Sequence, residues 1–488
     1  MQHDRAPESG RVDDEVDALA DFEVLIRDEH HYDRAGQVIA VAPPAADLAA
    51  PQSPQRPPRA PRAPVDPAVR RRRIRRAALG IGIPLVVLAA AAGGYVAWAL
   101  NAPLPAPTGP AAVAPTAPVG FAADVSFPRS GSAAISVSGA EDYLATSGDQ
   151  TWLASGGDDA RPMASITKLI TALVVLDAYP LEQNEDGPTI VFGPADRALY
   201  DYYYVRDATI APMPRGTSMS QRDALATMLI PSASNYATAL ARWAFGSDAG
   251  FTRAARAWLD EHGLTDTRVV EATGIDPRNT STPTDLLEVG RLASADPAIA
   301  AIVAMPSFEA ADGTSLINTN DLLGVDGITG LKTGTLSGSG SNLLYSATMD
   351  VGTETPLQIV GVVLGGQSRG AVSAGVLDTL ESIRGGFGTV ALAQRGDTLT
   401  TYTTEWGDSV DVIISEDASL LVWGDTPIEV RLDAGEPTAW IDGEQVGSIT
   451  WTAGPETITV PIEVDGTIDP PTDEWRLQHP QELLDAAR

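Results

Sequence analysis

The chain has 488 residues, 44% of them hydrophobic, and a formal net charge of −31 at pH 7, which argues against sequence-independent nucleic-acid binding by the chain as a whole. The absence of cysteine excludes disulfide bonds, cysteine–metal sites and a cysteine nucleophile. Only one of the five histidines, His262, lies in the central region, so a Ser-His-Asp triad has one possible base, and we expect neither a metal nor a cofactor.

Residues 1–76 are predicted to be a disordered cytoplasmic tail, with a partner-binding segment as the alternative. They are acidic at first and then rich in proline, with few aromatic residues. An arginine cluster over residues 70–76 ends this tail.

The segment 77–100 has 24 uncharged residues, and that length spans the ~30 Å hydrocarbon core of a bilayer. Because positive residues favour the cytoplasmic side, the arginine cluster before it predicts a single-pass membrane anchor with the rest of the chain outside the cytoplasm. A cleaved signal peptide is the alternative, but the apolar run is longer than is usual for one.

Residues 101–121 are rich in proline and alanine and carry no charge, which predicts a semi-rigid linker. At ~3.1 Å per residue, residues 101–119 of this stalk would hold the next domain roughly 55–60 Å from the membrane. A flexible linker is the alternative.

The segment 122–388 is predicted to be an α+β domain, because strand and helix patterns alternate along it. Expected strands at both ends of the segment predict an antiparallel sheet assembled from both ends. The expected strands are two within 132–155, one over 343–349 and one over 357–363. The expected helices are 165–179, two within 220–245, 251–262, 284–293 and 374–383.

Residues 389–466 alternate Thr, Val and Ile with polar residues, and they are predicted to form a small C-terminal β domain. Residues 467–488 are predicted to be an exposed tail.

Lysine occurs only twice in this chain, against 31 arginines, and both lysines lie in short motifs. Arginine cannot release its proton in a protein, whereas a buried lysine can, so the two lysines indicate chemistry. Lys168 follows Ser165 by one helical turn, on the same face of a predicted helix. Buried beside apolar residues and near a second cation, Lys168 would have a lowered pKa and could accept the proton of Ser165. A surface pair is the alternative for this motif alone.

Two further polar segments lie downstream of this motif. Lys332-Thr333-Gly334-Thr335 offers a cation, hydroxyls and an open backbone, which suits a peptide with a terminal carboxylate that binds as an added strand. A glycine-rich turn is the alternative. The segment 232–235 is a polar break between two predicted helices and can place a hydroxyl and an amide in a cleft.

In this order, Ser-x-x-Lys, Ser-x-Asn and Lys-Thr-Gly are the motif set of penicillin-binding proteins and serine β-lactamases. Over about residues 125–385 the chain resembles the low-molecular-mass D-alanyl-D-alanine carboxypeptidases of the peptidase S11 family. The resemblance implies a β-lactamase/transpeptidase-like fold, with an antiparallel sheet flanked by helices, a helical lobe and a cleft between them. The supporting stretches are Ala164–Lys168, Met228–Ser232, Ala272–Ile275, Ser281–Leu286 and Gly327–Thr335.

The resemblance also implies roles for the polar residues. Ser165 would be acylated, with Lys168 as its base, and Ser232 would relay a proton to the leaving D-alanine. Lys332 would support that hydroxyl and the substrate carboxylate. The backbone N–H groups of Ser165 and Thr335 would form the oxyanion hole.

The remaining implied site residues bind substrate, and they include one departure from the family pattern. Thr333, Gly334 and Thr335 would bind the substrate, with the two hydroxyls on its carboxylate. Gapless alignment places Ser234 where the family has Asn, and Asn235 follows one residue later. Either Ser234 takes the role with a shorter side chain, which we favour, or the loop shifts and Asn235 takes it.

The function implied by the resemblance is hydrolysis of the terminal D-Ala-D-Ala bond of peptidoglycan stem peptides, with β-lactams as inhibitors. A D,D-endopeptidase and a non-catalytic wall-binding homologue are alternatives. A β-lactamase is another alternative, but it usually needs an extra carboxylate on a loop before the Lys-Thr-Gly strand, and the sequence identifies none.

Overall fold

The computed structural model describes residues 67–148, 150–310 and 312–488. The chain divides into two compact units, Met1–Leu85 and Val86–Arg488. The first 66 residues of the predicted cytoplasmic tail lie outside the described residues.

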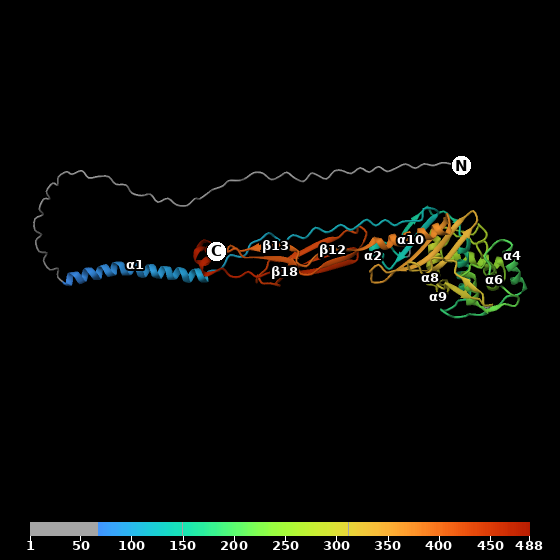
Figure 1. Ribbon diagram of the computed structural model, residues 1–488, viewed down its shortest axis with the longest axis horizontal. Helices are drawn as coiled ribbons and strands as arrows, with labels where there is room; N and C mark the ends of the chain where they lie inside the picture. Colours follow the sequence, from blue (N-terminus) through green and yellow to red (C-terminus); the bar gives the residue numbers. More distant parts are fainter. Residues whose placement is uncertain (1–66, 149, 311) are drawn as a thin grey trace, which may run out of the picture. The chain divides into compact units, whose positions relative to one another are not determined.

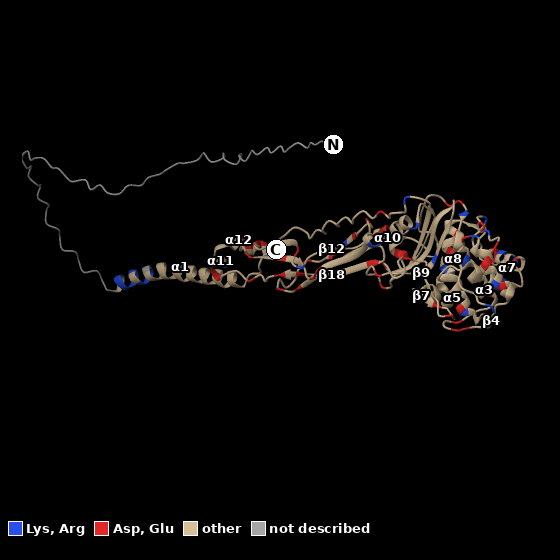
Figure 2. Cartoon of the chain, turned by 45° about the vertical axis from the view of Figure 1, so that its right-hand side comes forward, with Lys and Arg blue, Asp and Glu red and all other residues tan. Residues whose placement is uncertain are grey.

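A single long helix, α1 (Pro67–Asn101), contains the predicted membrane anchor. It begins ten residues before that anchor, because proline is favoured at the first helical position and arginine is a good helix former. The basic residues gather on its first turns, and the rest of the helix is uncharged (Figure 2). Within the described residues, its segment Arg70–Asn101 is the one candidate membrane span by length and composition, and an 18-residue window of it has a mean hydropathy of 2.0.

A five-stranded sheet forms the centre of the next region, and all its neighbouring strands are antiparallel. Its strand order is β2-β1-β11-β10-β9, so the first strands of the region pair with the last, as predicted. The strands are β1 (Ser132–Ser138), β2 (Leu153–Ser155), β9 (Ile328–Leu336), β10 (Gly340–Met349) and β11 (Leu357–Gly366).

Helices cover both faces of this sheet (Figure 1). Along β1, Ile135 and Val137 pack with α10 (Arg369–Gly386), whereas Ala134, the residue before Ile135, belongs to the core shared with α8 (Pro283–Ala295). Successive side chains of a strand point to opposite faces of the sheet, so β1 contributes apolar side chains to the core on the α10 face and to the core on the α8 face. This arrangement confirms the predicted α+β fold of helices on an antiparallel sheet.

The helical lobe lies on the α8 side of the sheet and shares its core. The expected helices are present, but most begin where a capping side chain allows; Ser247 caps α7 and Ser368 caps α10 several residues before the predicted starts. The lobe helices are α3 (Thr167–Ala178), α4 (Pro194–Tyr204), α5 (Gln221–Leu229), α6 (Ser234–Phe245), α7 (Asp248–Glu261) and α9 (Pro297–Val303).

Several short elements were not expected from the sequence, because they are too brief to show a hydrophobic period. They are α2 (Glu141–Leu144) and the paired strands β3 (Arg161–Pro162) with β6 (Thr280–Ser281), β4 (Thr189–Val191) with β5 (Ser218–Ser220), and β7 (Ser307–Glu309) with β8 (Ser315–Ile317). Two of the lobe helices, α4 and α9, were not expected from the sequence either.

The C-terminal region is a β domain, as predicted, with Trp451 fully buried in its core. A five-stranded sheet has the order β13-β14-β18-β17-β16, and β12 pairs with β15. The strands are β12 (Phe387–Ala393), β13 (Thr398–Thr403), β14 (Ser409–Ile414), β15 (Ala418–Trp423), β16 (Glu429–Ala434), β17 (Gln445–Ala453) and β18 (Glu456–Asp465).

The linker differs from the expected free stalk. Thr108 exchanges two backbone hydrogen bonds of 2.9 Å with Thr403 of β13, and Thr400 Oγ1 donates to the carbonyl of Pro110 at 2.6 Å. β13 ends its sheet, so its outer backbone groups are available to an adjacent extended segment.

The tail also differs from expectation, because it folds into α11 (Asp473–Gln478) and α12 (Pro480–Ala486). Leu483 is fully buried against Ala99 and Ala102 at the end of α1. The apolar residues of this short segment therefore have a packing partner that lies far away in the sequence.

Candidate active site

Ser165 lies in a one-turn 3-10 helix, Ala164–Ile166, directly before α3. Lys168 follows on the first turn of α3, and its Nζ donates to Ser165 Oγ at 3.0 Å. The same Nζ donates to the backbone carbonyl of Thr273 at 2.7 Å. The two predicted residues are therefore in direct contact, and a third group orients the amine.

Lys168 has no exposed surface. Burial lowers its pKa to about 7, against the opposing effect of the Glu271 carboxylate, which raises it. Near neutral pH the amine is therefore uncharged for a large part of the time and can accept a proton.

Ser232 lies between α5 and α6 with a backbone φ of 71°, in the left-handed region that non-glycine residues seldom adopt. Its hydroxyl is buried and has no hydrogen-bond partner among the described residues. Buried polar groups are usually paired, so a strained residue with a free hydroxyl indicates a group reserved for a ligand or a reaction.

The two candidates of the middle motif have different surroundings. The side chain of Asn235 is fully buried and pairs with the backbone of Ala211, accepting from its N–H at 3.1 Å and donating to its carbonyl at 2.9 Å. Ser234 begins α6, and its backbone N–H donates to the carbonyl of Thr209 at 2.8 Å. Because the amide of Asn235 already has structural partners, the gapless register with Ser234 fits the structure better.

Lys332 lies on β9, the last strand of the central sheet. Its buried Nζ donates to Thr319 Oγ1 and to the carbonyl of Thr333, both at 3.3 Å. Burial lowers its pKa well below the usual value, and the nearby cations Lys168 and Arg369 lower it further. Lys332 and Lys168 therefore lie close enough for their charges to interact.

The strand that carries Lys-Thr-Gly passes directly beside the Ser165 turn. A Cβ added to Gly334 would lie 2.8 Å from the carbonyl oxygen of Met163 and 3.3 Å from the backbone nitrogen of Ser165. Only glycine allows this approach without displacement. Among the strands that the structure describes, β9 pairs only with β10, and Thr335 on it is exposed, so its other edge is open to a peptide strand.

Sequence reasoning did not identify Thr319, Arg369 or Glu271. The hydroxyl of Thr319 shares a hydrogen bond of 2.7 Å with Thr333 Oγ1, and Arg369 donates to the Thr319 carbonyl. Arg369 also pairs with Asp321 at 3.0 Å, and its side chain is 47% exposed. None of these residues lies in a motif, so no local signal could have indicated them.

A cavity of about 410 Å³ lies behind the Thr273 segment and is lined by aromatic residues of α4, but not by Ser165 or Lys332. Among the described residues, no group of three or more histidine, aspartate and glutamate side chains could hold a metal ion.

The region that carries these residues matches known proteins. Residues 148–368 match the Peptidase S11 family model, described as D-alanyl-D-alanine carboxypeptidase. The D-alanyl-D-alanine endopeptidase of Escherichia coli is 33% identical over 133 residues, which are 27% of this chain and 39% of that relative. The endopeptidase of Pseudomonas aeruginosa is 35% identical over 26% of this chain and 37% of its own length. The chain thus spans about two fifths of these relatives.

Longer matches are more distant. D-alanyl-D-alanine carboxypeptidase DacC of Escherichia coli is 27% identical over 65% of this chain and 76% of that relative. The structure of penicillin binding protein 5 from Haemophilus influenzae has a TM-score of 0.47 and 18% identity, covering 71% of this chain and 98% of that chain. The match to the Peptidase S11 family model extends from residue 148 to residue 368, and this region contains Ser165, Ser232 and Lys332.

Proposed function

We propose that this protein is a serine D,D-carboxypeptidase, which hydrolyses the terminal D-Ala-D-Ala bond of peptidoglycan stem peptides and is acylated by β-lactams. The contact of 3.0 Å between Lys168 Nζ and Ser165 Oγ is the observation that carries the proposal. A buried amine with a pKa of about 7 supplies the base that a serine nucleophile needs.

Acylation begins when the neutral amine of Lys168 accepts the hydroxyl proton of Ser165. Ser165 Oγ then attacks the carbonyl carbon of the penultimate D-alanine, and the backbone N–H groups of Ser165 and Thr335 stabilise the negative charge on the carbonyl oxygen. The C–N bond breaks as the leaving amine takes the hydroxyl proton of Ser232; the Lys168 ammonium replaces that proton and is neutral again. In the second half of the reaction, a water molecule gives one proton to Lys168 and attacks the ester carbonyl. The Ser165 C–O bond then breaks, and Lys168 returns the proton to Ser165 Oγ.

The open edge of β9 holds the peptide in the proposed complex. The stem peptide lies along this edge as an added strand, and the hydroxyls of Thr333 and Thr335 bind its terminal carboxylate. Arg369 provides positive charge beside that carboxylate, and the amine of Lys332 can donate a hydrogen bond to it. The strand is unpaired on this side, and Arg369 lines the same small pocket as Thr333.

We also propose that α1 anchors the protein in the cell membrane with its N-terminus in the cytoplasm. The basic first turns of α1, followed by its apolar remainder, support this orientation. Digestion of intact spheroplasts with an added protease tests it, because only a domain outside the cytoplasm would be degraded.

The proposed activity is tested with a stem pentapeptide and a fluorescent penicillin. The wild-type protein is expected to release D-alanine, detected by mass spectrometry, and to be labelled by the penicillin; Ser165→Ala is expected to do neither. Labelling that does not depend on Ser165, or peptidoglycan binding without release of D-alanine, would contradict the proposal.

A D,D-endopeptidase is the second candidate, because two relatives with 33% and 35% identity carry that name. The two activities cleave bonds to a D-alanine carbonyl and differ in the leaving amine. A cross-linked muropeptide dimer offered together with the pentapeptide separates them, because an endopeptidase would convert the dimer into monomers.

A β-lactamase is not proposed, although Glu271 is a carboxylate on a loop before the Lys-Thr-Gly strand. Rapid deacylation needs a carboxylate that can bind and activate water. Both oxygens of Glu271 already accept hydrogen bonds from protein groups. Slow turnover of nitrocefin is therefore expected.

A further inference from the structure

We propose that Glu271 is a positioning residue: its carboxylate fixes the loop whose Thr273 carbonyl aims the amine of Lys168 at Ser165. The loop, residues 270–279, is called the Glu271 loop below. This inference rests on the proposed function, in which Lys168 is the base.

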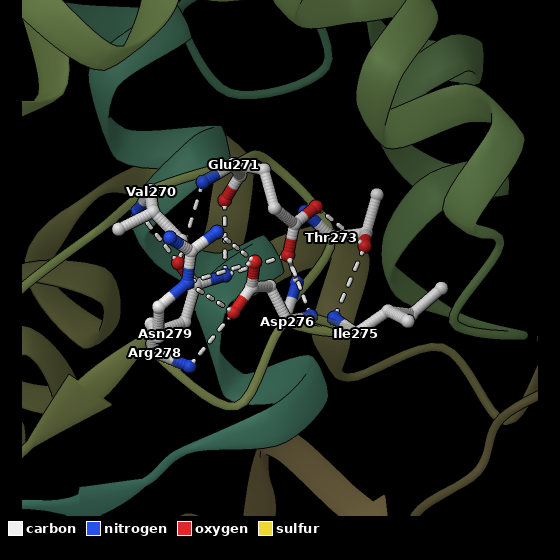
Figure 3. A network of polar contacts seen from close by, with 8 residues as sticks. Val270, Glu271, Thr273, Ile275, Asp276, Arg278 and Asn279 are labelled. Carbon is white, nitrogen blue, oxygen red and sulfur yellow. Dashed lines mark hydrogen bonds and ion pairs between the residues drawn. The ribbon is translucent and has the colours of Figure 1, made fainter.

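The Glu271 carboxylate organises its own loop from within (Figure 3). One oxygen accepts from the backbone N–H and the hydroxyl of Thr273, both at 2.7 Å. The other accepts from Gly274 N–H and from Asn279 Nδ2 at 2.6 Å, and from Asp276 N–H at 3.4 Å. No ion pair to Glu271 is present among the described residues. Its negative charge is therefore held by loop donors alone.

The Glu271 loop packs directly on the turn and helix that carry the reacting groups. Gly274 has a φ of 82°, and a Cβ added to it would lie 1.8 Å from the Ala164 carbonyl oxygen, so no other residue fits there. The other contacts are Thr171 Oγ1 to the Ala272 carbonyl at 2.9 Å and Lys168 Nζ to the Thr273 carbonyl at 2.7 Å. A shift of this loop would therefore move the acceptor of the amine.

The Thr273 carbonyl matters because a neutral amine has two N–H bonds and only one lone pair. When one N–H is donated to a fixed carbonyl, rotation about the last side-chain bond is restricted and the lone pair can be held toward the Ser165 hydroxyl. Misplacement of a reacting group by ~1 Å can cost about 100-fold in rate. The Glu271 side chain thus acts on the reaction indirectly. It positions the Thr273 carbonyl, and that carbonyl orients the Lys168 amine.

Glu271 also acts on Lys168 through charge. The carboxylate raises the pKa of Lys168 and so opposes the effect of burial. The other charged group near Lys168 is Lys332 on β9, and Arg369 lies close to Lys332. Removal of the Glu271 charge would remove the effect that opposes burial, so the pKa of Lys168 would fall further.

The test is the rate constant for acylation by a β-lactam, measured from about pH 5 to about pH 10 for the wild type and Glu271→Gln. The variant is expected to reach a maximum rate lower by about 10- to 100-fold, because the amine is less well oriented. The acidic limb of its profile is expected to move to lower pH, because the pKa of Lys168 falls. A role in stability alone would not move that limb.

Asp276→Asn is the matched control. Asp276 lies on the same loop, but its carboxylate pairs with the exposed Arg278, at 2.5 Å. We expect this variant to keep both the maximum rate and the acidic limb of the wild type. A similar change in both variants would indicate general loosening of the loop and would overturn the proposal.

Thermal unfolding establishes that Glu271→Gln is folded at the assay temperature. If Glu271→Gln is not folded, Thr273→Val tests the proposal instead. This variant removes one hydrogen-bond donor to Glu271 and keeps the backbone carbonyl that accepts from Lys168. It is expected to lower the maximum rate and leave the acidic limb in place; an unchanged rate would contradict the proposal. A wild-type protein that is not acylated at Ser165 would overturn the proposed function as well, whereas unchanged kinetics in folded Glu271→Gln would overturn this inference alone.

Discussion

Gly334 of β9 and Ser165 are in contact through their backbones: a Cβ added to Gly334 would lie 3.3 Å from the Ser165 nitrogen. The contact places the strand that binds the substrate carboxylate, in the proposed complex, beside the serine that attacks. Glycine is thus required at position 334 because the neighbouring backbone leaves no room for a side chain. Its φ lies outside the left-handed region, so the backbone conformation alone would not require glycine.

Gly334→Ala is therefore expected to lower acylation of Ser165. The new methyl group would lie 2.8 Å from the Met163 carbonyl oxygen, so β9 and the Ser165 turn must separate. The second-order rate constant for β-lactam acylation measures the effect, and a loss of about 10-fold or more is expected. Gly385→Ala on α10 is the control, because nothing lies within 4 Å of its added Cβ. Equal rates for both variants and the wild type would contradict this explanation.

Lys168→Met is expected to abolish acylation and also to stabilise the fold near neutral pH. In the unfolded chain the amine has its ordinary pKa of 10.5, whereas in the folded protein burial lowers the pKa to about 7. Between these values the unfolded chain binds a proton that the folded protein does not, so the free energy of unfolding rises with pH across this window. Below about pH 7 the folded protein must hold a buried charge, and the penalty is largest.

Chemical denaturation at several pH values checks this prediction. The variant should be more stable than the wild type at pH 7 by about 1 kcal/mol or more, and the difference should shrink toward pH 10.5. A variant that is less stable at pH 7 would show that the hydrogen bonds of the amine outweigh its desolvation.

The chemistry of the site was predictable from the sequence because it is local. A serine and a lysine one turn apart, and a glycine two residues after a lysine, keep their spacing in the sequence whatever the rest of the chain does. The layered α+β fold followed from hydrophobic periodicity. The Thr273 carbonyl could not be predicted, because any residue supplies a carbonyl and only the path of the loop brings it to Lys168. The pairing of Thr108 with Thr403 was missed for the same reason, since it joins segments far apart in the chain.

Ser234→Ala is expected mainly to reduce acylation, whereas Asn235→Ala is expected mainly to reduce stability. Asn235→Ala leaves both backbone groups of Ala211 without their partners in a buried site, so a loss of stability of about 2 to 4 kcal/mol is expected. Ser234→Ala should change stability little and should reduce acylation more than Asn235→Ala does in the folded protein. Thermal unfolding and penicillin labelling measure the two effects, and the reverse pattern would assign the family's Asn role to Asn235.

Arg369→Gln is expected to weaken substrate binding more than it slows the chemical step. The guanidinium group contacts the Thr319 carbonyl and lines the pocket beside Thr333, where the proposal places the substrate carboxylate. A hydrogen bond to a charged group contributes about 1.5 to 3 kcal/mol, so KM for a stem pentapeptide should rise roughly 10- to 100-fold with a smaller change in kcat. Arg384→Gln is the control on the same helix, because Arg384 pairs with Glu381 and Asp326 instead. A fall in kcat at unchanged KM would place Arg369 in the chemical step and contradict its role in binding.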